Sequence, residues 1–579
     1  MPEKSSNDDD DSNNKINNNI KMKNKSAIIT SALPYANGEI HLGHIASTYL
    51  PADIFTRFSR LNGRKAYHVC ATDDFGTPIL IKAEKEGKTP QEYVAHWNRR
   101  DYDDFTALGI SFDFFYRTSS PENVRFVQYA FSRLRENGHI YEQDVVQFYC
   151  EFDDKFLPDR YVVGRCPFCG AENQYSDLCE KCGRVPDEIL DPKCAICGRP
   201  PVKKHSTHYF FKLSDFSGRL KSWLLSNQNL QDDVRNYVIN WIDEGLQEWD
   251  ITRDLSWGVP IPLPDAKGKV FYGWFDNHLC YISTMTKYVE DNKIVVGKED
   301  GKKFWNESEV YHFIGKDIVY HHYLFLPAMR LGMNEEYKLP DWIPTRGHLM
   351  LQDQKISKSR NWYIGLRQFL EAFPADYLRF YMASIITYSQ DDLNFDFDGF
   401  AERINNELIA NVGNFVNRAL SFTQKAYGGK VPAPGEPGED ERKAREMTES
   451  AVRDAGLLLS ANETDKALKK IMELSTHFNQ YFQKKKPWSD TKESASTTLY
   501  YAANAARTLA ILLEPFIPFS SEKIWAQLGL QGSVHGQSWQ SAADLLAIPA
   551  GHQLGKVEPI FKKIEAKEIE EQKAKLGIK

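Results

Sequence analysis

A cluster of Cys-x-x-Cys pairs interrupts a chain that otherwise alternates between strand-like and helix-like segments. Two of the pairs have the spacing of a zinc knuckle, in which four thiolates hold one tetrahedral Zn²⁺. The four candidate ligands are Cys166, Cys169, Cys179 and Cys182. Because a closed set of four cysteines is typical of a structural site, the spacing predicts a small zinc-bearing insert that splits a larger α/β domain.

A third pair of cysteines follows this knuckle without an obvious partner pair. A second Zn²⁺ site would use the nearest remaining cysteine and an aspartate close to it. Its candidate ligands are Cys150, Cys194, Cys197 and, less directly, Asp153. The alternative is a degenerate knuckle that packing alone holds. Cys70 and Cys280 stand alone in apolar surroundings and are predicted to be small core residues.

Length and composition limit the class of protein. A chain of 579 residues is too long for a single core and should form about three or four domains. The net charge of -7 does not indicate a nucleic-acid partner, so an RNA would have to bind local basic patches. No apolar run approaches the roughly 18 residues of a membrane helix, and the polar N-terminus is unlike a secretory signal. Most of the nine cysteines lie in pairs that suit a metal in a reducing compartment, so we expect a cytoplasmic protein.

The first α/β segment has the pattern of a strand–helix–strand unit. A short apolar run from Ser26 to Leu33 ends at Pro34, a helical periodicity begins near His41, and the run AYHVCATDD predicts a second strand. In parallel sheets of this kind, ligands bind at the carboxyl ends of the strands. The tetrapeptide HLGH falls at that place.

Changes of pattern divide the chain into segments. The Asn/Asp-rich start is too polar to bury surface, and apolar spacings of three and four residues after residue 394 predict a helical bundle. The expected segments are a disordered tail (1–25), a first α/β half (26–140), the cysteine-bearing insert (141–250), a second α/β half (251–340), a loop segment (341–393), the helical bundle (394–547) and a C-terminal helix (548–579).

Two short motifs predict a nucleotide site. His41 and His44 of HLGH lie on one face at a helix start, where the helix dipole favours a phosphate, and Gly43 leaves room for a base and ribose. In KISKS, Lys358 and less directly Lys355 could hold the phosphates that leave during activation of a carboxylate. Either motif alone is more typical of chance or of a solvated loop, but their order along two α/β halves favours the nucleotide site.

With these motifs and the cysteine pairs between them, the chain resembles the methionyl-tRNA synthetases of the archaeal and eukaryotic zinc-knuckle type, which are class I aminoacyl-tRNA synthetases. The likeness runs from about Ser26 to Ala547 and includes TSALPYANGEIHLGH, YHFIGKDIVYHH and KKKPW. It implies a Rossmann-type parallel-sheet catalytic domain, a zinc-knuckle insert, a stem-contact segment with the KISKS loop and an α-helical anticodon-binding bundle. It also implies a ligase that uses L-methionine, tRNA(Met) and ATP with Mg²⁺. Because no oligonucleotide-binding domain is appended before Lys579, we expect a monomer.

The resemblance implies roles for individual residues. Methionine would contact Ala32, Leu33, Tyr35, Asp73, Trp274, Tyr281, Ile318 and His322, with Asp73 on the ammonium group. ATP would contact Tyr35, Gly43, Gly315, Asp317 and Lys358, with Asp317 on the ribose. Activation would use His41, His44, Lys355, Lys358 and Arg253. The anticodon would contact Asn406, Arg418 and Trp488, with the indole stacked on a base.

The chain departs from the family at one place. After W-[FL]-D the family commonly has a small residue and then often proline, but here Asn277 and His278 follow Asp276. Either these side chains point away from the methionine side chain, or the pocket is smaller or more polar than usual.

Three alternatives stay open at this point. Another class I synthetase is one, although the insert is too small for the editing domain of the branched-chain enzymes. A catalytically silent zinc- and RNA-binding paralogue is the second, although a binding module needs neither HLGH nor KISKS. A small-molecule adenylyltransferase is the third, although it would leave the helical C-terminal third without a purpose.

Overall fold

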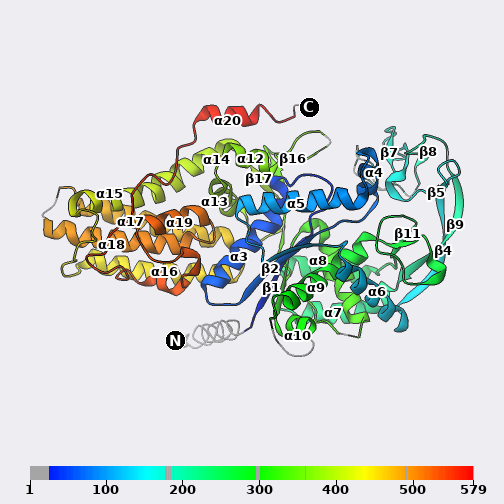
Figure 1. Ribbon diagram of the computed structural model, residues 1–579, viewed down its shortest axis with the longest axis horizontal. Helices are drawn as coiled ribbons and strands as arrows, with labels where there is room; N and C mark the ends of the chain where they lie inside the picture. The colour runs from blue at the N-terminus through cyan, green and yellow to red at the C-terminus, as the bar shows by residue number, and fades with distance from the viewer. Residues whose placement is uncertain are drawn as a thin grey trace, which may run out of the picture.

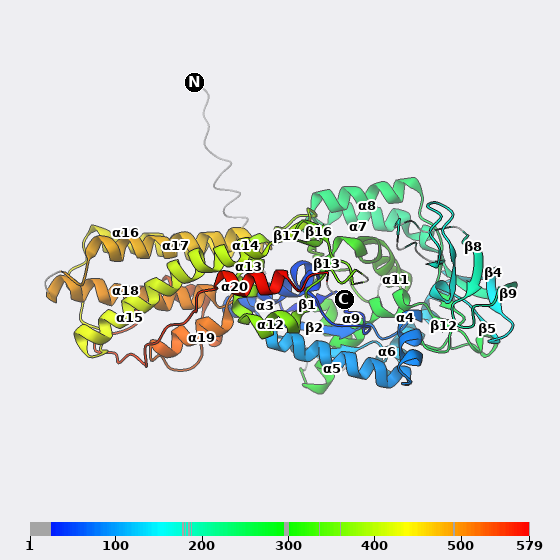
Figure 2. The same ribbon diagram turned by 90° about the horizontal axis from the view of Figure 1, so that it is seen from above.

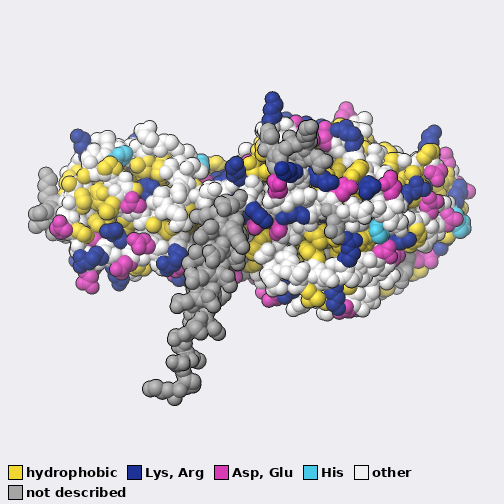
Figure 3. Space-filling view, turned by 90° about the horizontal axis from the view of Figure 1, so that it is seen from below, with side chains coloured by type: hydrophobic (Ala, Val, Ile, Leu, Met, Phe, Trp, Pro, Cys, Tyr) yellow, Lys and Arg dark blue, Asp and Glu magenta, His cyan; other side chains and the backbone are white. Residues whose placement is uncertain are grey.

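The computed structural model describes residues 25–577, except 177–178, 180, 183, 185, 187, 295–299, 335, 359 and 490–491. The expected disordered tail therefore lies almost wholly outside the described residues, as does Ser359 of KISKS. The molecule is elongated, with a helical bundle at one end, an α/β domain in the middle and the cysteine-bearing insert at the other end (Figures 1 and 2). On the face shown in Figure 3, Lys and Arg side chains are interspersed with Asp and Glu.

A parallel five-stranded sheet forms the centre of the α/β domain. Its strand order is β14-β13-β1-β2-β3, and every neighbouring pair is parallel. The strands are β1 (Ala27–Ser31), β2 (Ala66–Thr72), β3 (Phe114–Arg117), β13 (Glu309–Gly315) and β14 (Thr345–Arg346). Both predicted strands of the first α/β half are confirmed, as is the α/β fold class.

Helices cover both faces of this sheet. Alternate residues of a strand point to opposite faces, so one strand contacts both layers of helices. Ile28 of β1 belongs to the core cluster that contains Leu279 and Ile282 of α9 (Gly273–Asp291). Ile29, the next residue, packs instead in the cluster that contains Phe55 of α3 (Leu50–Leu61). The continuous apolar run of β1 thus has a physical reason, since neither face of this strand meets water.

The insert is built on a long antiparallel hairpin. Strand β4 (Ile140–Cys150) pairs with β9 (Val202–Phe211) along most of its length. Between them in sequence lies a small sheet of order β7-β6-β8, made of β6 (Val162–Arg165), β7 (Gln174–Tyr175) and β8 (Leu190–Cys194). The Cys-x-x-Cys turns lie around this small sheet, at the end of the molecule far from the bundle (Figure 1).

The C-terminal part is a helical bundle, as predicted. Its long helices are α15 (Asn414–Tyr427), α16 (Glu439–Ser460), α17 (Thr464–Lys485), α18 (Lys492–Leu513) and α19 (Pro518–Gln527). The Pro/Gly-rich break falls between α15 and α16. In the sequence, apolar residues spaced for one helical face supply the packing surfaces of these helices.

The C-terminal helix is shorter than expected. Only α20 (Ala566–Lys573) is helical within the expected range 548–579, because Pro549, Gly551, Gly555 and Pro559 interrupt the preceding segment. This segment runs back from the bundle to the α/β domain (Figure 2). The backbone N–H of Gly577 donates to the carbonyl of Asn361, just after KISKS, at 3.1 Å, an ordinary hydrogen-bond length.

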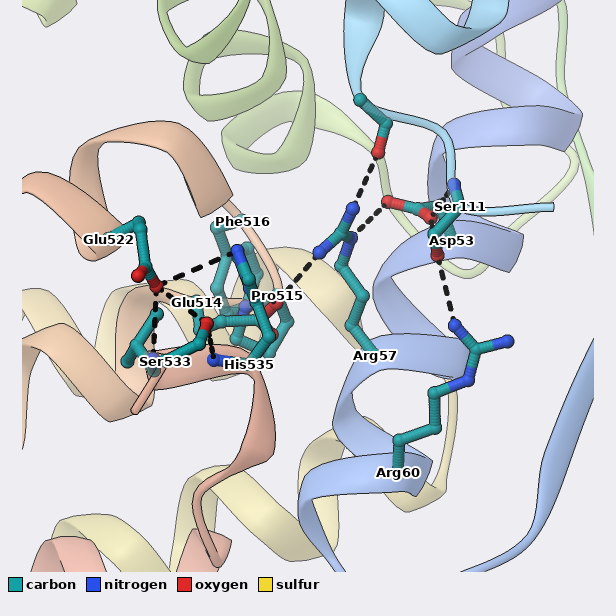
Figure 4. Close-up of polar contacts among 12 residues, drawn as sticks. Asp53, Arg57, Arg60, Ser111, Glu514, Pro515, Phe516, Glu522, Ser533 and His535 are labelled. Carbon is teal, nitrogen blue, oxygen red and sulfur yellow. Dashed lines mark hydrogen bonds and ion pairs between the residues drawn. The ribbon is translucent and has the colours of Figure 1, made fainter. Parts of the chain in front are cut away.

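A buried polar cluster joins the α/β domain to the bundle (Figure 4). One carboxylate oxygen of Asp53 in α3 accepts from Arg57 Nε (2.8 Å) and from Arg379 Nη2 (2.7 Å). The other oxygen accepts from the backbone N–H and the hydroxyl of Ser111. Arg57 Nη1 continues to Glu514, directly after α18, at 2.7 Å. Asp53 and Arg379 are fully buried, so charge pairing at this junction takes place away from water.

Candidate active site

HLGH lies at the start of the helix that follows β1. His41 is extended and precedes α2 (Leu42–His44), which continues through a π-helical turn, η1 (Ile45–Tyr49), into α3. The two imidazole rings stack with centroids 3.6 Å apart, and the backbone N–H of His41 donates to Nδ1 of His44 at 3.1 Å. Burial and then the charge of Lys358 lower the pKa of His41 to about 3, and burial lowers the pKa of His44 as well. Both rings are therefore neutral hydrogen-bonding groups.

The KISKS loop folds over this helix start. Lys358 Nζ donates to the carbonyl of Glu39 at 3.0 Å, and Tyr363, shortly after the motif, donates to the Glu39 carboxylate at 2.7 Å. A Cβ at Gly43 would lie 3.1 Å from Cδ1 of Ile356, so glycine at this position allows the loop to approach closely. Burial lowers the pKa of Lys358. The two motifs, far apart in sequence, thus meet at one place.

A cavity of about 830 Å³ opens between these motifs and the carboxyl ends of the strands. Every residue predicted for methionine, ATP or activation lines it. These are Ala32, Leu33, Tyr35, His41, Gly43, His44, Asp73, Arg253, Trp274, Tyr281, Gly315, Asp317, Ile318, His322, Lys355 and Lys358. The structure therefore brings the whole predicted set into a single chamber of the size that a nucleotide and an amino acid need.

The side of the cavity predicted for methionine combines apolar walls with a few fixed polar groups. His322 Nδ1 lies 3.0 Å from the carbonyl of Ile318, which fixes the proton on Nδ1, and Nε2 then accepts from the hydroxyl of Tyr281 at 2.9 Å. Burial lowers the pKa of His322 to about 4, so the ring is neutral. Burial raises the pKa of Asp73. A bound cation would restore the ionised form of this carboxylate.

The unusual pair Asn277–His278 has two different fates. Asn277 lines the cavity and donates from Nδ2 to Asp73 Oδ2 at 3.3 Å, so this part of the pocket is more polar than expected for the family. His278 is fully buried and does not line the cavity. Its ring lies edge-on to His322, with centroids 4.9 Å apart. The interpretation that the side chain points away thus holds for His278, and the interpretation of a more polar pocket holds for Asn277.

Several lining or supporting residues escaped the sequence analysis. His348 Nε2 lies 3.2 Å from Asp317 Oδ1, beside the position predicted for the ribose, and Arg160 reaches the cavity from the insert. The ring of His321 stacks on Trp274 with centroids 3.9 Å apart. His348 comes just after β14, so the rule that ligands bind at the carboxyl ends of strands could have found it. Arg160 carries no such local signal.

Each cysteine cluster brings four potential ligand atoms together. The sulfur atoms of the knuckle cysteines lie within 4.8 Å of one another, and so do the ligand atoms of Cys150, Asp153, Cys194 and Cys197. Asp153 lies 3.0 Å from the sulfur of Cys150 and 3.1 Å from that of Cys194. Both sets could hold a metal ion. Cys70 and Cys280 are buried in the core, as predicted.

The residues predicted for the anticodon do not all come together. Trp488 is 41% exposed, and the guanidinium of Arg418 lies 4.9 Å from its ring centroid. Asn406 is exposed and lies twelve positions before Arg418, about three helical turns away. Lys484 and Lys485, just before Trp488, pair with Asp440 and Glu441 of α16, which makes their charges less available to a phosphate.

A parallel sheet with HLGH after its first strand, KISKS folded against it and a helical C-terminal bundle defines a class I aminoacyl-tRNA synthetase. Comparison with family models agrees: residues 27–420 match the tRNA synthetases class I (M), and residues 431–579 match the anticodon binding domain of methionyl tRNA ligase. The chain belongs to this family of methionine–tRNA ligases. The resemblance drawn from its motifs is confirmed.

Known proteins resemble the chain over most of its length. The methionine–tRNA ligase of Thermococcus kodakarensis is 44% identical over 562 residues, which cover 94% of this chain and 74% of the relative. That of Methanopyrus kandleri is 42% identical over 559 residues, 95% of this chain and 81% of the relative. The crystal structure of Mycobacterium tuberculosis methionyl-tRNA synthetase bound by methionyl-adenylate has a TM-score of 0.76 and 23% identity, and covers 93% of this chain and all of that one. Among the described residues, no helix is long and apolar enough to cross a bilayer.

Proposed function

We propose that the chain activates L-methionine with ATP to methionyl-adenylate and transfers the methionyl group to the 3′ end of tRNA(Met). The observation that carries this proposal is the single cavity in which both nucleotide motifs meet the residues predicted to bind methionine. Membership of the methionine–tRNA ligase family supports this function. It argues against two of the alternatives, a branched-chain synthetase and a small-molecule adenylyltransferase.

The residues of the cavity divide the work between binding and activation. Asp73 pairs with the ammonium group of methionine, while Trp274 and Tyr281 hold the side chain. Asp317 binds the ribose of ATP, whose phosphates bring Mg²⁺ with them. Neutral His41 and His44 donate N–H groups to the α-phosphate, and Lys358 leaves Glu39 to hold the departing pyrophosphate. Such groups, fixed before reaction, stabilise the charge that develops in the transition state.

Amino-acid-dependent exchange of pyrophosphate into ATP tests the proposal. Purified protein is expected to exchange pyrophosphate with methionine and with none of the other standard amino acids at equal concentration. A protein that charges tRNA(Met) only after addition of a second synthetase would be a binding paralogue. Exchange with a different amino acid would overturn the choice of substrate.

We further propose Zn²⁺ as the metal of both cysteine clusters. Thiolates favour Zn²⁺ in tetrahedral sites, and three cysteines with one carboxylate form an acceptable ligand set. None of the eight residues of these clusters lines the cavity, so a metal there would hold the fold of the insert. We also propose, as the sequence predicted, that the protein is a cytoplasmic monomer with the segment boundaries given above.

Elemental analysis is expected to find two Zn²⁺ per chain. Asp153→Ala should lower this content to about one, because one of the four ligands of the second cluster is lost while the knuckle keeps its four thiolates. Asp154→Asn is the matched control, since the neighbouring residue is outside the ligand set. Two zinc ions retained in Asp153→Ala would remove the aspartate from the site, and none in the wild type would refute both sites.

For the anticodon, we propose Trp488 and Arg418 as the principal contacts. An exposed indole beside a guanidinium suits a stacked base and its phosphate. Asn414 is exposed one helical turn before Arg418 on the same face, which makes it a better partner than Asn406.

Trp488→Ala is expected to weaken tRNA(Met) binding by about 1–3 kcal/mol, the contribution of one stacked base. Methionine-dependent pyrophosphate exchange should stay unchanged, because the cavity lies in the α/β domain. Aminoacylation and exchange are measured on the same preparation. Tyr237→Ala, which removes an exposed ring outside the helical bundle, serves as control. An equal loss in both reactions would show that Trp488 supports the fold instead.

A further inference from the structure

A histidine of the insert lies behind one wall of the cavity. His208 is on β9, on the long hairpin of the insert, and is fully buried. Its Nδ1 lies 2.6 Å from Asp250 Oδ2, and its Nε2 lies 3.0 Å from Asp254 Oδ2. A ring that contacts a carboxylate with each nitrogen is held in one orientation.

The two aspartates flank the arginine predicted to act in activation. Asp250 ends β10 (Trp249–Asp250), Arg253 ends β11 (Thr252–Arg253), and Asp254 follows directly. Arg253 Nη1 lies 3.4 Å from Asp250 Oδ2 and donates to the carbonyl of Thr252 at 2.7 Å. Its guanidinium lies 4.0 Å from the ring centroid of Tyr272 and lines the cavity. His208 thus ties together both ends of the short segment that presents Arg253.

The charges around His208 favour its protonated form. Burial lowers its pKa, but the hydrogen bonds to Asp250 and Asp254 and the charge of Asp250 outweigh burial and raise the pKa above the ordinary value. Lys269 opposes this shift and also donates to Asp254 Oδ1 at 2.5 Å. The other groups that face this network are Ser206 on β9, Gln147 on β4 and Arg253 itself. An imidazolium between two carboxylates satisfies both of them, whereas a neutral ring can donate to only one.

We propose that His208 is a positioning residue for amino-acid activation: it clamps Asp250 and Asp254 so that Arg253 points into the cavity. The insert would then contribute to the reaction through β9. This inference rests on the proposed function, because it takes Arg253 to act in the activation step. It assigns a role to a residue that touches no substrate.

His208→Gln tests the clamp, because glutamine fills similar space but cannot carry the charge. Methionine-dependent pyrophosphate exchange is expected to lose about 10- to 100-fold in kcat, as a small displacement of a reacting group does. KM for methionine should change less than about twofold, because Asp73 and Trp274 are untouched. Thr207→Ala is the matched control and should behave as wild type, because Thr207 directly precedes His208 on β9 but is exposed.

The pH dependence separates a clamp from a purely structural role. The folded protein holds His208 protonated below its raised pKa, so the advantage of wild type over His208→Gln in kcat should be full near pH 6. It should shrink as the pH rises through that raised value. A ratio that does not change between pH 6 and pH 9 would contradict the charged clamp.

A double-mutant cycle tests whether His208 acts through Arg253. If it does, His208→Gln should have no further effect in the Arg253→Ala background. Asp254→Asn reaches the same link from the other side, and it replaces His208→Gln if that variant melts early. Additive losses, or full activity of either single variant, overturn the inference. A wild type that fails to exchange pyrophosphate with methionine contradicts the proposed function itself, and the inference with it.

Discussion

Alanine in place of His44 is expected to slow methionine-dependent pyrophosphate exchange by about 100- to 1,000-fold. Removal of one fixed donor to a developing oxyanion has an effect of this size, equivalent to about 3–4 kcal/mol of transition-state stabilisation. The ring is neutral at working pH because burial lowers its pKa, so the loss is that of a hydrogen bond and its orientation. Since His44 also fixes the stacked ring of His41, part of the effect passes through that neighbour.

The same experiment distinguishes chemistry from binding. Methionine affinity, measured by calorimetry without ATP, should change less than about twofold in His44→Ala, because uniform binding and transition-state binding are separate quantities. His96→Ala is the control, since it removes an exposed histidine of α5 (Pro90–Leu108) outside the cavity. A near-normal rate of pyrophosphate exchange in His44→Ala would contradict the assignment of HLGH to the phosphate site.

Asp53→Ala is expected to destabilise the folded protein by about 3–5 kcal/mol, because it leaves the fully buried charge of Arg379 without its carboxylate. Arg57 keeps Glu514 and is affected less. The shift in the urea midpoint, at an unchanged slope, measures the effect. Asp103→Ala, an exposed aspartate of α5, should stay within about 0.5 kcal/mol of wild type.

The contribution of Asp53 should also depend on pH. Burial acts to raise the pKa of Asp53, but Arg57, Arg379 and the bonds from Ser111 outweigh it and hold that pKa well below its usual range. A depressed pKa in the folded state means that the stabilisation is present above the unfolded value of about 4 and is lost as the pH falls toward the folded value. The gap between wild type and Asp53→Ala should therefore narrow below about pH 4. A constant gap from pH 7 to pH 3 would show that packing alone is responsible.

The parts of the fold that local pattern determines were predictable from sequence. Strand β1 reads as an apolar run because both of its faces are covered, and HLGH could be placed because ligand sites follow strands of that kind. The zinc-type spacing likewise placed the insert. Residues that act through partners far away in sequence could not be foreseen, such as Lys484, whose charge is taken up by Asp440 of another helix.

Side-chain direction was the other limit. Sequence showed that Asn277 and His278 are unusual, but only packing decides that one faces Asp73 and the other turns behind the pocket wall. The shortened α20 is a different case, since the prolines and glycines that end the helix pattern are visible in the sequence. The role of His208 could not be foreseen because its partners are far away in sequence. Asp250 lies 42 positions further along the chain and Asp254 lies 46 positions further.

The cluster around Asp53 limits how this protein can be recombined with its relatives. A chimera that takes its bundle from another family member brings a foreign residue to position 514 and foreign carbonyls to meet Arg379, which here donates to those of Pro515 and Phe516. A mismatch would leave Arg57 without Glu514, or Arg379 without these carbonyls, so that buried N–H donors lose an acceptor even though both guanidinium groups keep Asp53. The α/β domain and the helical bundle look like separable modules in the ribbon. Their junction, however, requires that the residues on its two sides come from the same protein. Exchange between lineages should succeed only where both sides of the junction travel together.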